Sequence, residues 1–361
     1  MKLNVLPKAR EEIDNVPDTE YAPDEKLANI KADLSLNINP YGVSNNVMKK
    51  LKEISNSQIS HYYIENKELI EKIAEYIGVN PENILLSDGC DGCIDMIAKT
   101  YIKKNDSVII PTPTFHRYEF HTKIMGGNTV FVPMQNFIFN AESILAEANK
   151  VNASLAFLCN PNNPTGLGID KDEKIKFIEN FPGLIVVDEA LADITKINGS
   201  KLIDKYNNIV IVRSFSKTFG LASLRIGYII ANVEIINEIK KTSSPFRVNG
   251  LAQELALEAL KDTEHIQQSK LFLHSEREYL ENELDSLGIP YSKSITTNFL
   301  VDLEKFGNFK KTLEQLKEKG VLVTDARPFG LSKHTYVRIA VSSKDENRYF
   351  IKILKELIEK N

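Results

Sequence analysis

The chain has 361 residues, of which 45 are basic and 49 acidic, and its formal net charge is −4. This near balance disfavours nucleic acid or an anionic membrane surface as a partner. No apolar stretch approaches the length of a membrane span, and three cysteines are too few for a disulfide framework in a chain of this size.

The N-terminal region is polar. Residues Met1–Asp14 are charged and lack an apolar core, so we expect no signal peptide and a cytoplasmic location. The stretch Asp14–Lys31 has few apolar residues and is expected to lie across other parts of the molecule.

Short apolar runs, mostly of β-branched residues, alternate with helical patterns between Pro81 and Ala231. Such runs are typical of strands that are covered on both faces, as in a largely parallel sheet. The runs are Val108–Ile110, Val130–Val132, Leu155–Leu158, Leu184–Val187 and Ile209–Val212. The alternation predicts an α/β fold with a large, doubly wound, mostly parallel sheet.

The pattern changes after Ile235. We expect a helical tract over Leu251–Leu287, then strands at Asn298–Leu303 and Val337–Val341, with a helix rich in Glu and Lys at Phe309–Lys319 between them. This order is typical of a smaller α+β domain. We therefore predict an N-terminal arm of residues 1–36 that packs with the small domain, a large domain of residues 37–235, and a small domain of residues 236–361.

A lysine and several hydrogen-bond donors follow the strand Ile209–Val212. Lys217 must lose its proton to condense with an aldehyde, and partial burial near other cations favours that loss. Ser214, Ser216 and Arg225 can supply donors to a phosphate. A solvated surface lysine is the alternative, but a side chain that follows an apolar strand is expected to point into the cleft at the carboxyl ends of the strands.

Two further strand ends carry polar side chains. Asp188 ends the run Leu184–Val187, where a buried carboxylate could keep a pyridine nitrogen protonated; a helix cap is an equally simple interpretation. The segment Asn160–Gly166 is a turn by composition. A functional role for this turn requires one amide, that of Asn163, to bond a phenolic oxygen.

The segment Ser87–Met96 predicts a turn that opens a helix, and the free amides near Cys90 and Asp91 would form a phosphate cup. Cys90 and Cys93 also form a C-x-x-C pair, which could indicate a redox pair or half of a zinc site. Zinc would need two more soft ligands, and only Cys159 remains.

Histidine and aromatic side chains give weaker signals. His116 and His121 form no metal-binding motif, so no metal site is predicted. Phe115 could stack on a planar ring or belong to the core.

Taken together, these motifs resemble those of the fold-type I pyridoxal-phosphate aminotransferases of class I and II, and within them the histidinol-phosphate aminotransferases. The resemblance covers nearly the whole chain. It rests on the segments Asn37–Gly42, Asn160–Gly166, Val187–Ala190, Ser214–Arg225 and Tyr336–Arg338. The lysine motif and the asparagine turn are specific in combination, whereas Asp-Glu-Ala alone would be weak.

The resemblance implies pyridoxal 5'-phosphate as cofactor, bound as a Schiff base on Lys217. It implies that Asp188 bonds the pyridine nitrogen, Asn163 the phenolic oxygen, and that Phe115 lies over the ring. The residues that it assigns to the phosphate are Ser214, Ser216, Arg225, Cys90 and Asp91.

The resemblance also implies a substrate site and a homodimer with a shared active site. Arg338 looks like the arginine that grips a substrate carboxylate, a task suited to its planar fork. Tyr62 looks like the tyrosine that reaches the neighbouring subunit's cofactor phosphate, with Tyr63 as a competing candidate. Tyr21 resembles the substrate-binding arm of these aminotransferases, and Asn163 is expected to contact the substrate as well.

Three positions depart from the family pattern. Leu191 replaces a common tyrosine, Ile38 replaces an acidic residue, and Thr324 replaces an arginine for the substrate phosphate, although Arg327 lies three residues away. Leu191 and Ile38 favour the related threonine-phosphate decarboxylases, whose glycine-rich start is absent here.

The resulting functional prediction is transamination from an amino acid, with glutamate as the expected donor, to a small phosphorylated keto or aldehyde compound. The alternatives are decarboxylation of phosphoserine or phosphothreonine, and a cofactor-binding protein without catalysis.

Overall fold

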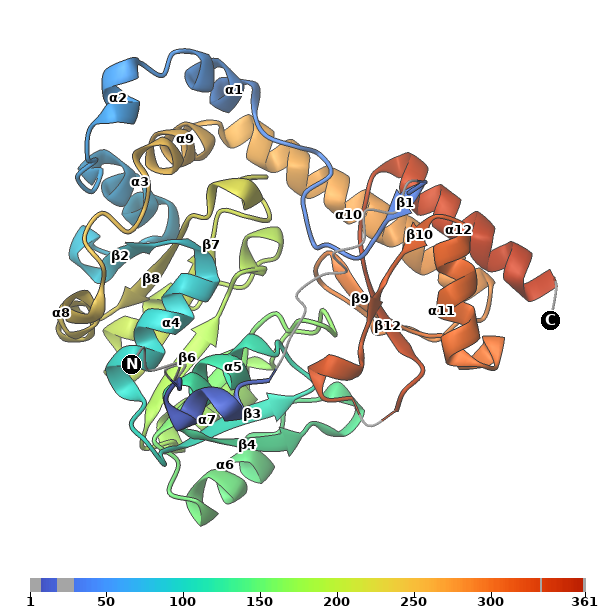
Figure 1. Cartoon of the computed structure of the whole chain (residues 1–361), viewed down its shortest axis with the longest axis horizontal. Helices are drawn as coiled ribbons and strands as arrows, with labels where there is room; N and C mark the ends of the chain where they lie inside the picture. The colour runs from blue at the N-terminus through green and yellow to red at the C-terminus, as the bar shows by residue number, and fades with distance from the viewer. Residues whose placement is uncertain (1–7, 18–28, 332, 360–361) are drawn as a thin grey trace, which may run out of the picture.

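The computed structural model describes residues 8–17, 29–331 and 333–359 (Figure 1). Within these ranges, the large unit is built on a sheet of seven strands in the order β2-β8-β7-β6-β5-β3-β4. The strands are β2 (Ile84–Ser87), β3 (Ser107–Thr112), β4 (Asn128–Pro133), β5 (Leu155–Cys159), β6 (Leu184–Asp188), β7 (Ile209–Ser214) and β8 (Gly227–Ala231).

The sheet is mostly parallel. Strands β4, β3, β5, β6 and β7 pair in parallel, whereas β8 is antiparallel to both β7 and β2. The five predicted strands and the doubly wound α/β class are confirmed. Strands β2 and β8 are not among the predicted strands; they are the two strands of this sheet that join it through antiparallel pairs.

Helices cover both faces of this sheet, which explains why its strands read as unbroken apolar runs. In β6, Ile185 and Val187 face one hydrophobic cluster while Val186 faces another. The first cluster includes α1 (Asn45–Lys52), α3 (Lys67–Ile77), α6 (Ala141–Lys150), α7 (Lys171–Asn180) and α9 (Gly250–Lys261). The second includes α4 (Gly89–Tyr101), α5 (Arg117–Ile124) and α8 (Val233–Thr242).

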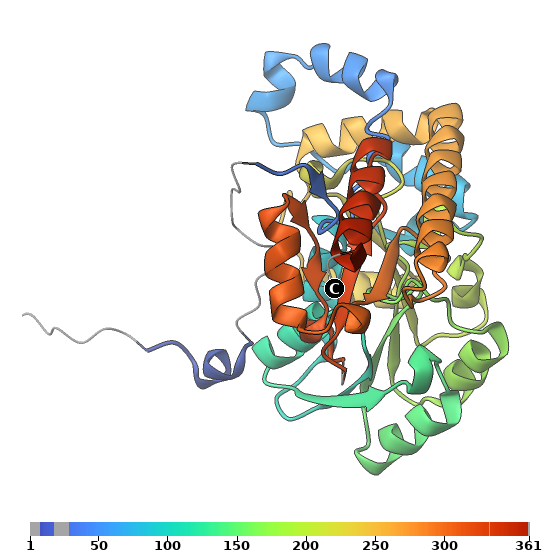
Figure 2. The ribbon, with the colours of Figure 1, turned by 90° about the vertical axis from the view of Figure 1, so that its right-hand side faces the viewer.

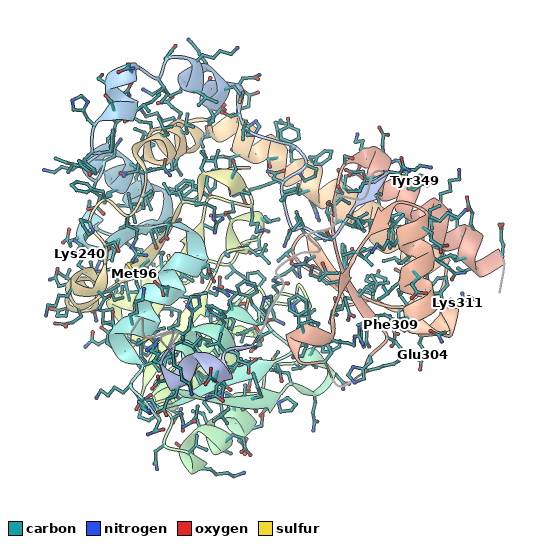
Figure 3. All side chains as sticks on the ribbon, viewed as in Figure 1. Met96, Lys240, Glu304, Phe309, Lys311 and Tyr349 are labelled. Atoms are coloured by element: carbon teal, nitrogen blue, oxygen red, sulfur yellow. The ribbon has the colours of Figure 1, made fainter. Side chains whose placement is uncertain are left out.

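The small unit has a separate core. Strands β11 (Thr324–Asp325), β12 (Tyr336–Ala340) and β9 (Asn298–Asp302) form an antiparallel sheet, and β1 (Ala32–Asp33) pairs in parallel with β10 (Val321–Leu322). The helices that pack in this core are α11 (Phe309–Glu318), α12 (Lys344–Glu359) and the C-terminal part of α10 (Thr263–Ser286). In Figure 2 the small unit faces the viewer, with α11 and α12 in orange and red at the front. Figure 3 places Phe309, Lys311 and Tyr349 at the end of the molecule away from the large sheet.

The predicted helical tract Leu251–Leu287 is confirmed, and it consists of two helices, α9 and α10. Asp262 interrupts it, because its side chain accepts the backbone N–H of His265 and thereby caps the start of α10. Residues up to Ile266 share the core of the large unit, and residues from Leu273 onward share the core of the small unit. We therefore propose that the boundary between the two domains lies within α10 rather than at residue 236.

The N-terminal segment contacts both units. Ala32 and Leu34 belong to the small-unit core, whereas the short helix Glu11–Asn15 lies against the large unit, where Lys104 Nζ is 3.0 Å from Glu12 Oε1. Tyr21, which the sequence predicts to lie in a substrate-binding arm, is outside the described residues. The short helix α2 (Asn56–Ser60) follows α1 at the surface of the molecule (Figure 1). Among the helices in the described ranges, none has the length and apolar character that a membrane crossing requires.

Candidate active site

A cavity of about 560 Å³ opens where the carboxyl ends of β5, β6 and β7 face the small unit. This is the edge at which ligands bind in parallel sheets. Most of the residues singled out from the sequence line it. They are Ile38, Cys90, Asp91, Phe115, Asn163, Asp188, Leu191, Ser214, Ser216, Lys217, Arg225, Thr324 and Arg338.

Lys217 lies three residues beyond the end of β7, and its Nζ donates a hydrogen bond to the backbone carbonyl of Asn37. Burial and the positive charge of Arg338 lower the pKa of Lys217 to about 8. The charge of Arg225 acts in the same direction. With this pKa the amine is neutral in about a tenth of molecules at pH 7, far more than for an ordinary lysine, so it can act as a nucleophile or a base.

Asp188 is buried at the end of β6, with 4% of its surface exposed. Tyr118 donates a hydrogen bond of 2.7 Å to its Oδ2, and the N–H of Ala190 donates one of 2.9 Å to its Oδ1. Burial raises the pKa of Asp188 above its ordinary value, and the two hydrogen bonds oppose that rise. A buried carboxylate of this kind is suited to pair with a protonated ring nitrogen.

Tyr118 was missed by the sequence analysis. Its ring stacks on Phe157 at 4.8 Å between centroids, and it meets Phe115 edge to face at 5.7 Å. The available signal was its spacing, three residues after Phe115, which places both rings on one side of the chain as it enters α5.

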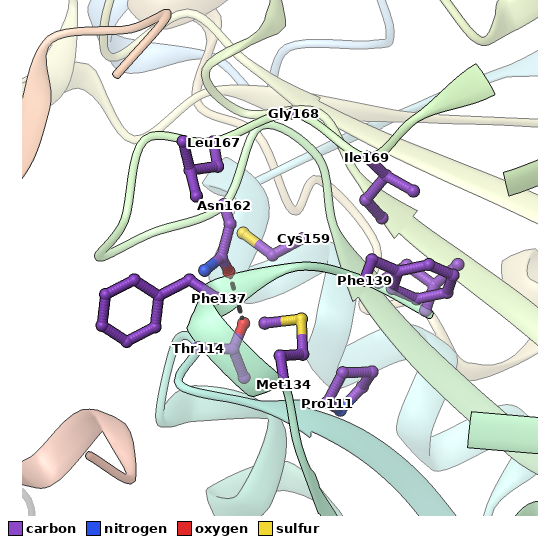
Figure 4. Close-up of a pocket in the computed structure, with 11 residues that line it drawn as sticks. Pro111, Thr114, Met134, Phe137, Phe139, Cys159, Asn162, Leu167, Gly168 and Ile169 are labelled. Atoms are coloured by element: carbon purple, nitrogen blue, oxygen red, sulfur yellow. Dashed lines mark hydrogen bonds between the residues drawn. The ribbon is translucent and has the colours of Figure 1, made fainter. Parts of the chain in front are cut away.

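The asparagine turn is held from both units. Thr114 Oγ1 donates a hydrogen bond of 3.0 Å to Asn162 Oδ1, and Figure 4 shows this bond in a small pocket behind the turn. Asn298, on β9 of the small unit, donates a hydrogen bond of 2.8 Å to the carbonyl of Pro164. Asn163 Oδ1 is buried without a hydrogen-bond partner among the described residues. Because buried polar atoms are rarely left unpaired, this side chain is poised for a ligand.

The first turn of α4 and Arg225 bring hydrogen-bond donors to the cavity. Gly89 begins α4 with φ +87°, and a Cβ at this position would lie 2.8 Å from Arg225 Nη2. Glycine is therefore required for Arg225 to reach the free amides of the helix N-terminus, which form an anion site. Ser214 and Ser216 line the same cavity and are both buried, and Ser214 Oγ accepts the N–H of Ser216 at 3.0 Å.

The predicted phosphate contact of Asp91 can come only from its backbone, because its carboxylate is paired with Arg117 at 2.8 Å and with His121 at 3.0 Å. The three cysteines are unpaired, and burial raises the pKa of each thiol. No group of three metal-ligating side chains occurs in the described part of the chain.

Arg338 lies on β12, faces the cavity and is 7% exposed. Its Nη2 donates a hydrogen bond of 2.9 Å to Thr324 Oγ1 and another to the carbonyl of Ser35. The Phe329 ring lies 5.7 Å from its guanidinium carbon. These contacts hold the guanidinium at the cavity wall.

Arg327 does not join this wall. It lies at the surface, where its Nε donates a hydrogen bond of 2.8 Å to Asp325, and it is not among the residues that line the cavity. The structure thus gives no support to a substrate contact by Arg327, because a neighbour two residues away in the chain binds its side chain.

The two tyrosine candidates differ in their surroundings. Tyr62 is 84% exposed and stacks on Phe246 at 4.7 Å between centroids. Tyr63 donates a hydrogen bond to Glu254, and burial together with this contact raises its pKa to about 12. Since Tyr63 is bound within its own chain, Tyr62 is the better candidate for a contact with a second subunit.

The residues of this cavity fit pyridoxal phosphate. Its aldehyde would meet Lys217, its ring nitrogen Asp188, its phenolic oxygen Asn163 and its phosphate the turn at Gly89 with Arg225. The orphaned Oδ1 of Asn163 and the glycine that a Cβ would close to Arg225 are the structural observations behind this fit.

Comparisons with known proteins show what the chain is similar to. Residues 29–354 match the family model described as aminotransferase class I and II. The histidinol-phosphate aminotransferase of Caldicellulosiruptor saccharolyticus is 35% identical over 353 residues, which cover 94% of this chain and 97% of that protein.

Two solved structures are also similar. The histidinol-phosphate aminotransferase from Sinorhizobium meliloti in complex with pyridoxal-5'-phosphate matches with a TM-score of 0.87, at 21% identity and over 99% of both chains. At this identity the likeness shows the shared fold alone. The L-threonine-O-3-phosphate decarboxylase from Porphyromonas gingivalis matches with a TM-score of 0.78, at 27% identity, over 91% of this chain and 99% of that one.

Proposed function

This chain belongs to the family of class I and II aminotransferases and depends on pyridoxal phosphate, and we propose that it moves an amino group from glutamate to a small phosphorylated keto or aldehyde compound. The observation that carries the proposal is the presence of Lys217, Asp188 and Arg338 in one cavity. The name of the relative from Caldicellulosiruptor supports a phosphorylated substrate.

When bound, pyridoxal phosphate supplies a ring that withdraws electrons from the α-carbon of an amino acid. Lys217 Nζ would remove the proton from that carbon and later return one, a role that its lowered pKa of about 8 permits. Asp188 would hold a proton on the ring nitrogen, since a buried carboxylate is strongly attracted to a cation beside it.

Arg338 would select the bond that reacts. Its planar guanidinium can bind a substrate carboxylate through two parallel hydrogen bonds and thereby fix the rotation about the amino acid's C–N bond. An aminotransferase must place the Cα–H bond perpendicular to the cofactor ring, whereas a decarboxylase must place the bond to the carboxylate there. Arg338 beside the cavity favours the first arrangement.

The test is a half-reaction. Glutamate alone, added to the cofactor-loaded protein, is expected to remove the visible absorption band of the bound cofactor and to release one equivalent of 2-oxoglutarate per site. An unchanged spectrum with glutamate and with other amino donors would sink the proposal.

Decarboxylation of phosphothreonine or phosphoserine is the second candidate, favoured by the likeness to the Porphyromonas gingivalis enzyme and by Leu191 and Ile38 at the cavity wall. The two reactions separate cleanly, because only decarboxylation releases carbon dioxide without a keto acceptor. A cofactor-binding protein without catalysis is disfavoured by the joint presence of Lys217, Asp188 and Arg338 in the cavity.

We further propose that two copies of the chain share each active site. Exposed apolar side chains gather around Tyr62, among them Ile59, Ile64 and Phe246, as expected for a surface that a second subunit covers. In this arrangement the hydroxyl of Tyr62 would bind the phosphate in the partner's cavity.

A further inference from the structure

An ion cluster joins the first turns of α4 and α5 and has no role in the function proposed above. Arg117 donates hydrogen bonds of 2.8 Å and 2.9 Å to the two carboxylate oxygens of Asp91. His121, one turn further along α5, places its Nε2 3.0 Å from Asp91 Oδ1. The fork of an arginine and both oxygens of a carboxylate make this the geometry of a strong ion pair.

Packing fixes Arg117 in this position. Its side chain is 17% exposed, that of His121 is 5% exposed and that of Asp91 is 39% exposed. The Phe120 ring lies under the guanidinium, 3.6 Å from its central carbon. Burial tends to raise the pKa of Asp91, but the hydrogen bonds from His121 and Arg117 outweigh it and hold that pKa well below its usual range. Asp91 is therefore ionised at every working pH.

The negative charge of Asp91 lies at the expected phosphate site. Asp91 is the third residue of α4 and lines the cavity at the turn where Arg225 meets Gly89. That turn is where the cofactor's phosphate is expected, and an unpaired carboxylate there would repel the phosphate. Arg117 lines the same cavity and is bound to Asp91 by both carboxylate oxygens, so it cancels that repulsion.

We propose that Arg117 is a positioning residue: by neutralising Asp91 and tying it to α5, it makes the first turn of α4 a binding site for the cofactor's phosphate. The inference rests on the proposed cofactor site at this turn. It does not depend on the amino donor or on the choice between transamination and decarboxylation.

The test measures binding of pyridoxal phosphate to the cofactor-free full chain by absorbance titration. Arg117→Met leaves Asp91 charged and in contact with His121 alone. We expect the dissociation constant to rise roughly ten- to hundredfold, as for like charges a few ångströms apart. In the double variant Asp91→Asn/Arg117→Met, neither charge remains, and the constant is expected to return to within about threefold of the original protein. Inorganic phosphate, used as a competitor, should show the same order of affinities.

Two controls accompany these variants. Lys241→Met breaks the exposed Lys241–Glu238 pair of 2.7 Å on α8, outside this cluster, and should leave cofactor binding unchanged. The thermal unfolding of each cofactor-free variant identifies loss of fold, and Arg117→Gln carries the same comparison if Arg117→Met does not fold.

Each other outcome overturns the inference. If the double variant binds as weakly as Arg117→Met, Arg117 contacts the cofactor directly instead of acting through Asp91. If Arg117→Met binds the cofactor normally but raises the KM of a substrate, Arg117 recognises the substrate. Failure of the glutamate half-reaction in the unmodified protein bears on the proposed function alone, because these titrations involve no amino donor.

Discussion

Tyr118 donates its hydroxyl hydrogen to Asp188 Oδ2 across 2.7 Å, between the first turn of α5 and the end of β6. The bond lies beneath the cavity and lowers the pKa of a carboxylate that burial raises. It therefore helps to keep Asp188 ionised, as its proposed pairing with a protonated ring nitrogen requires.

Tyr118→Phe is expected to raise the pKa of Asp188 and to lower kcat/KM about tenfold or more, since hydrogen bonds to charged groups contribute about 1.5–3 kcal/mol. The sign follows from the carboxylate: a higher pKa means that activity is lost at a higher pH on the acid side. The pH profile of kcat/KM measures this shift. Tyr349→Phe is the matched control, because it removes a hydroxyl that bonds Lys319 far from the cavity (Figure 3). An acid limb that stays in place would contradict this role of Tyr118.

The rate at which the cofactor-free protein captures pyridoxal phosphate should follow the deprotonation of Lys217. Because the pKa is lowered to about 8, the rate is expected to rise through about pH 8 and then to level off, whereas an ordinary lysine would continue to gain reactivity above pH 10. Arg338→Met removes the largest cause after burial and should move the midpoint upward. Stopped-flow measurements of the visible band give both midpoints, and a midpoint near pH 10 in the unmodified protein would refute this account.

Gly89→Ala is expected to weaken cofactor binding. The added Cβ would meet Arg225 Nη2 at 2.8 Å and would also require an alanine at φ +87°. Gly78→Ala is the matched control, because its φ is +79° but its Cβ would meet Lys201 at an ordinary 3.6 Å. Both variants should lose about 1 kcal/mol of stability from the left-handed conformation. Only Gly89→Ala should raise the dissociation constant of pyridoxal phosphate. Equal effects of both variants on this constant would contradict a role of Arg225 in binding the phosphate.

A shared site predicts complementation between inactive subunits. Tyr62→Ala and Lys217→Ala should each impair activity when alone. Mixing the two proteins under conditions that exchange subunits should restore activity, because each hybrid dimer contains one cavity with both an intact Lys217 and an intact Tyr62. No gain on mixing, with subunit exchange verified by native mass spectrometry, would exclude a cofactor contact by the partner's Tyr62.

The sequence patterns were sufficient where local residue order determines the result. Apolar runs between Val108 and Val212 identified the central strands, and polar residues just after them identified Lys217, Asp188 and Asn163 as neighbours. Parallel strands bring their carboxyl ends to one edge, so this part of the site follows from the order of the elements.

The remaining features depend on contacts between distant segments. The bond from Tyr118 to Asp188 joins residues 70 positions apart, and Asn298 reaches the asparagine turn from 134 positions away. The surface pairing of Arg327 with Asp325 shows the same limit at short range, because a charged residue near a motif can be bound by a neighbour instead of a substrate. The helical pattern of apolar residues also continues across Asp262, so it does not predict the side-chain cap that divides this tract into two helices.

The central claim is that Lys217 binds the cofactor, and one measurement tests it most directly. The cofactor-loaded protein is reduced with borohydride and digested with a protease, and the masses of its peptides are measured by mass spectrometry. The account predicts that the reduced cofactor is attached to the peptide that contains Lys217, and that Lys217→Ala carries no attached cofactor after the same treatment. Attachment to a different lysine, or undiminished attachment in Lys217→Ala, would contradict it.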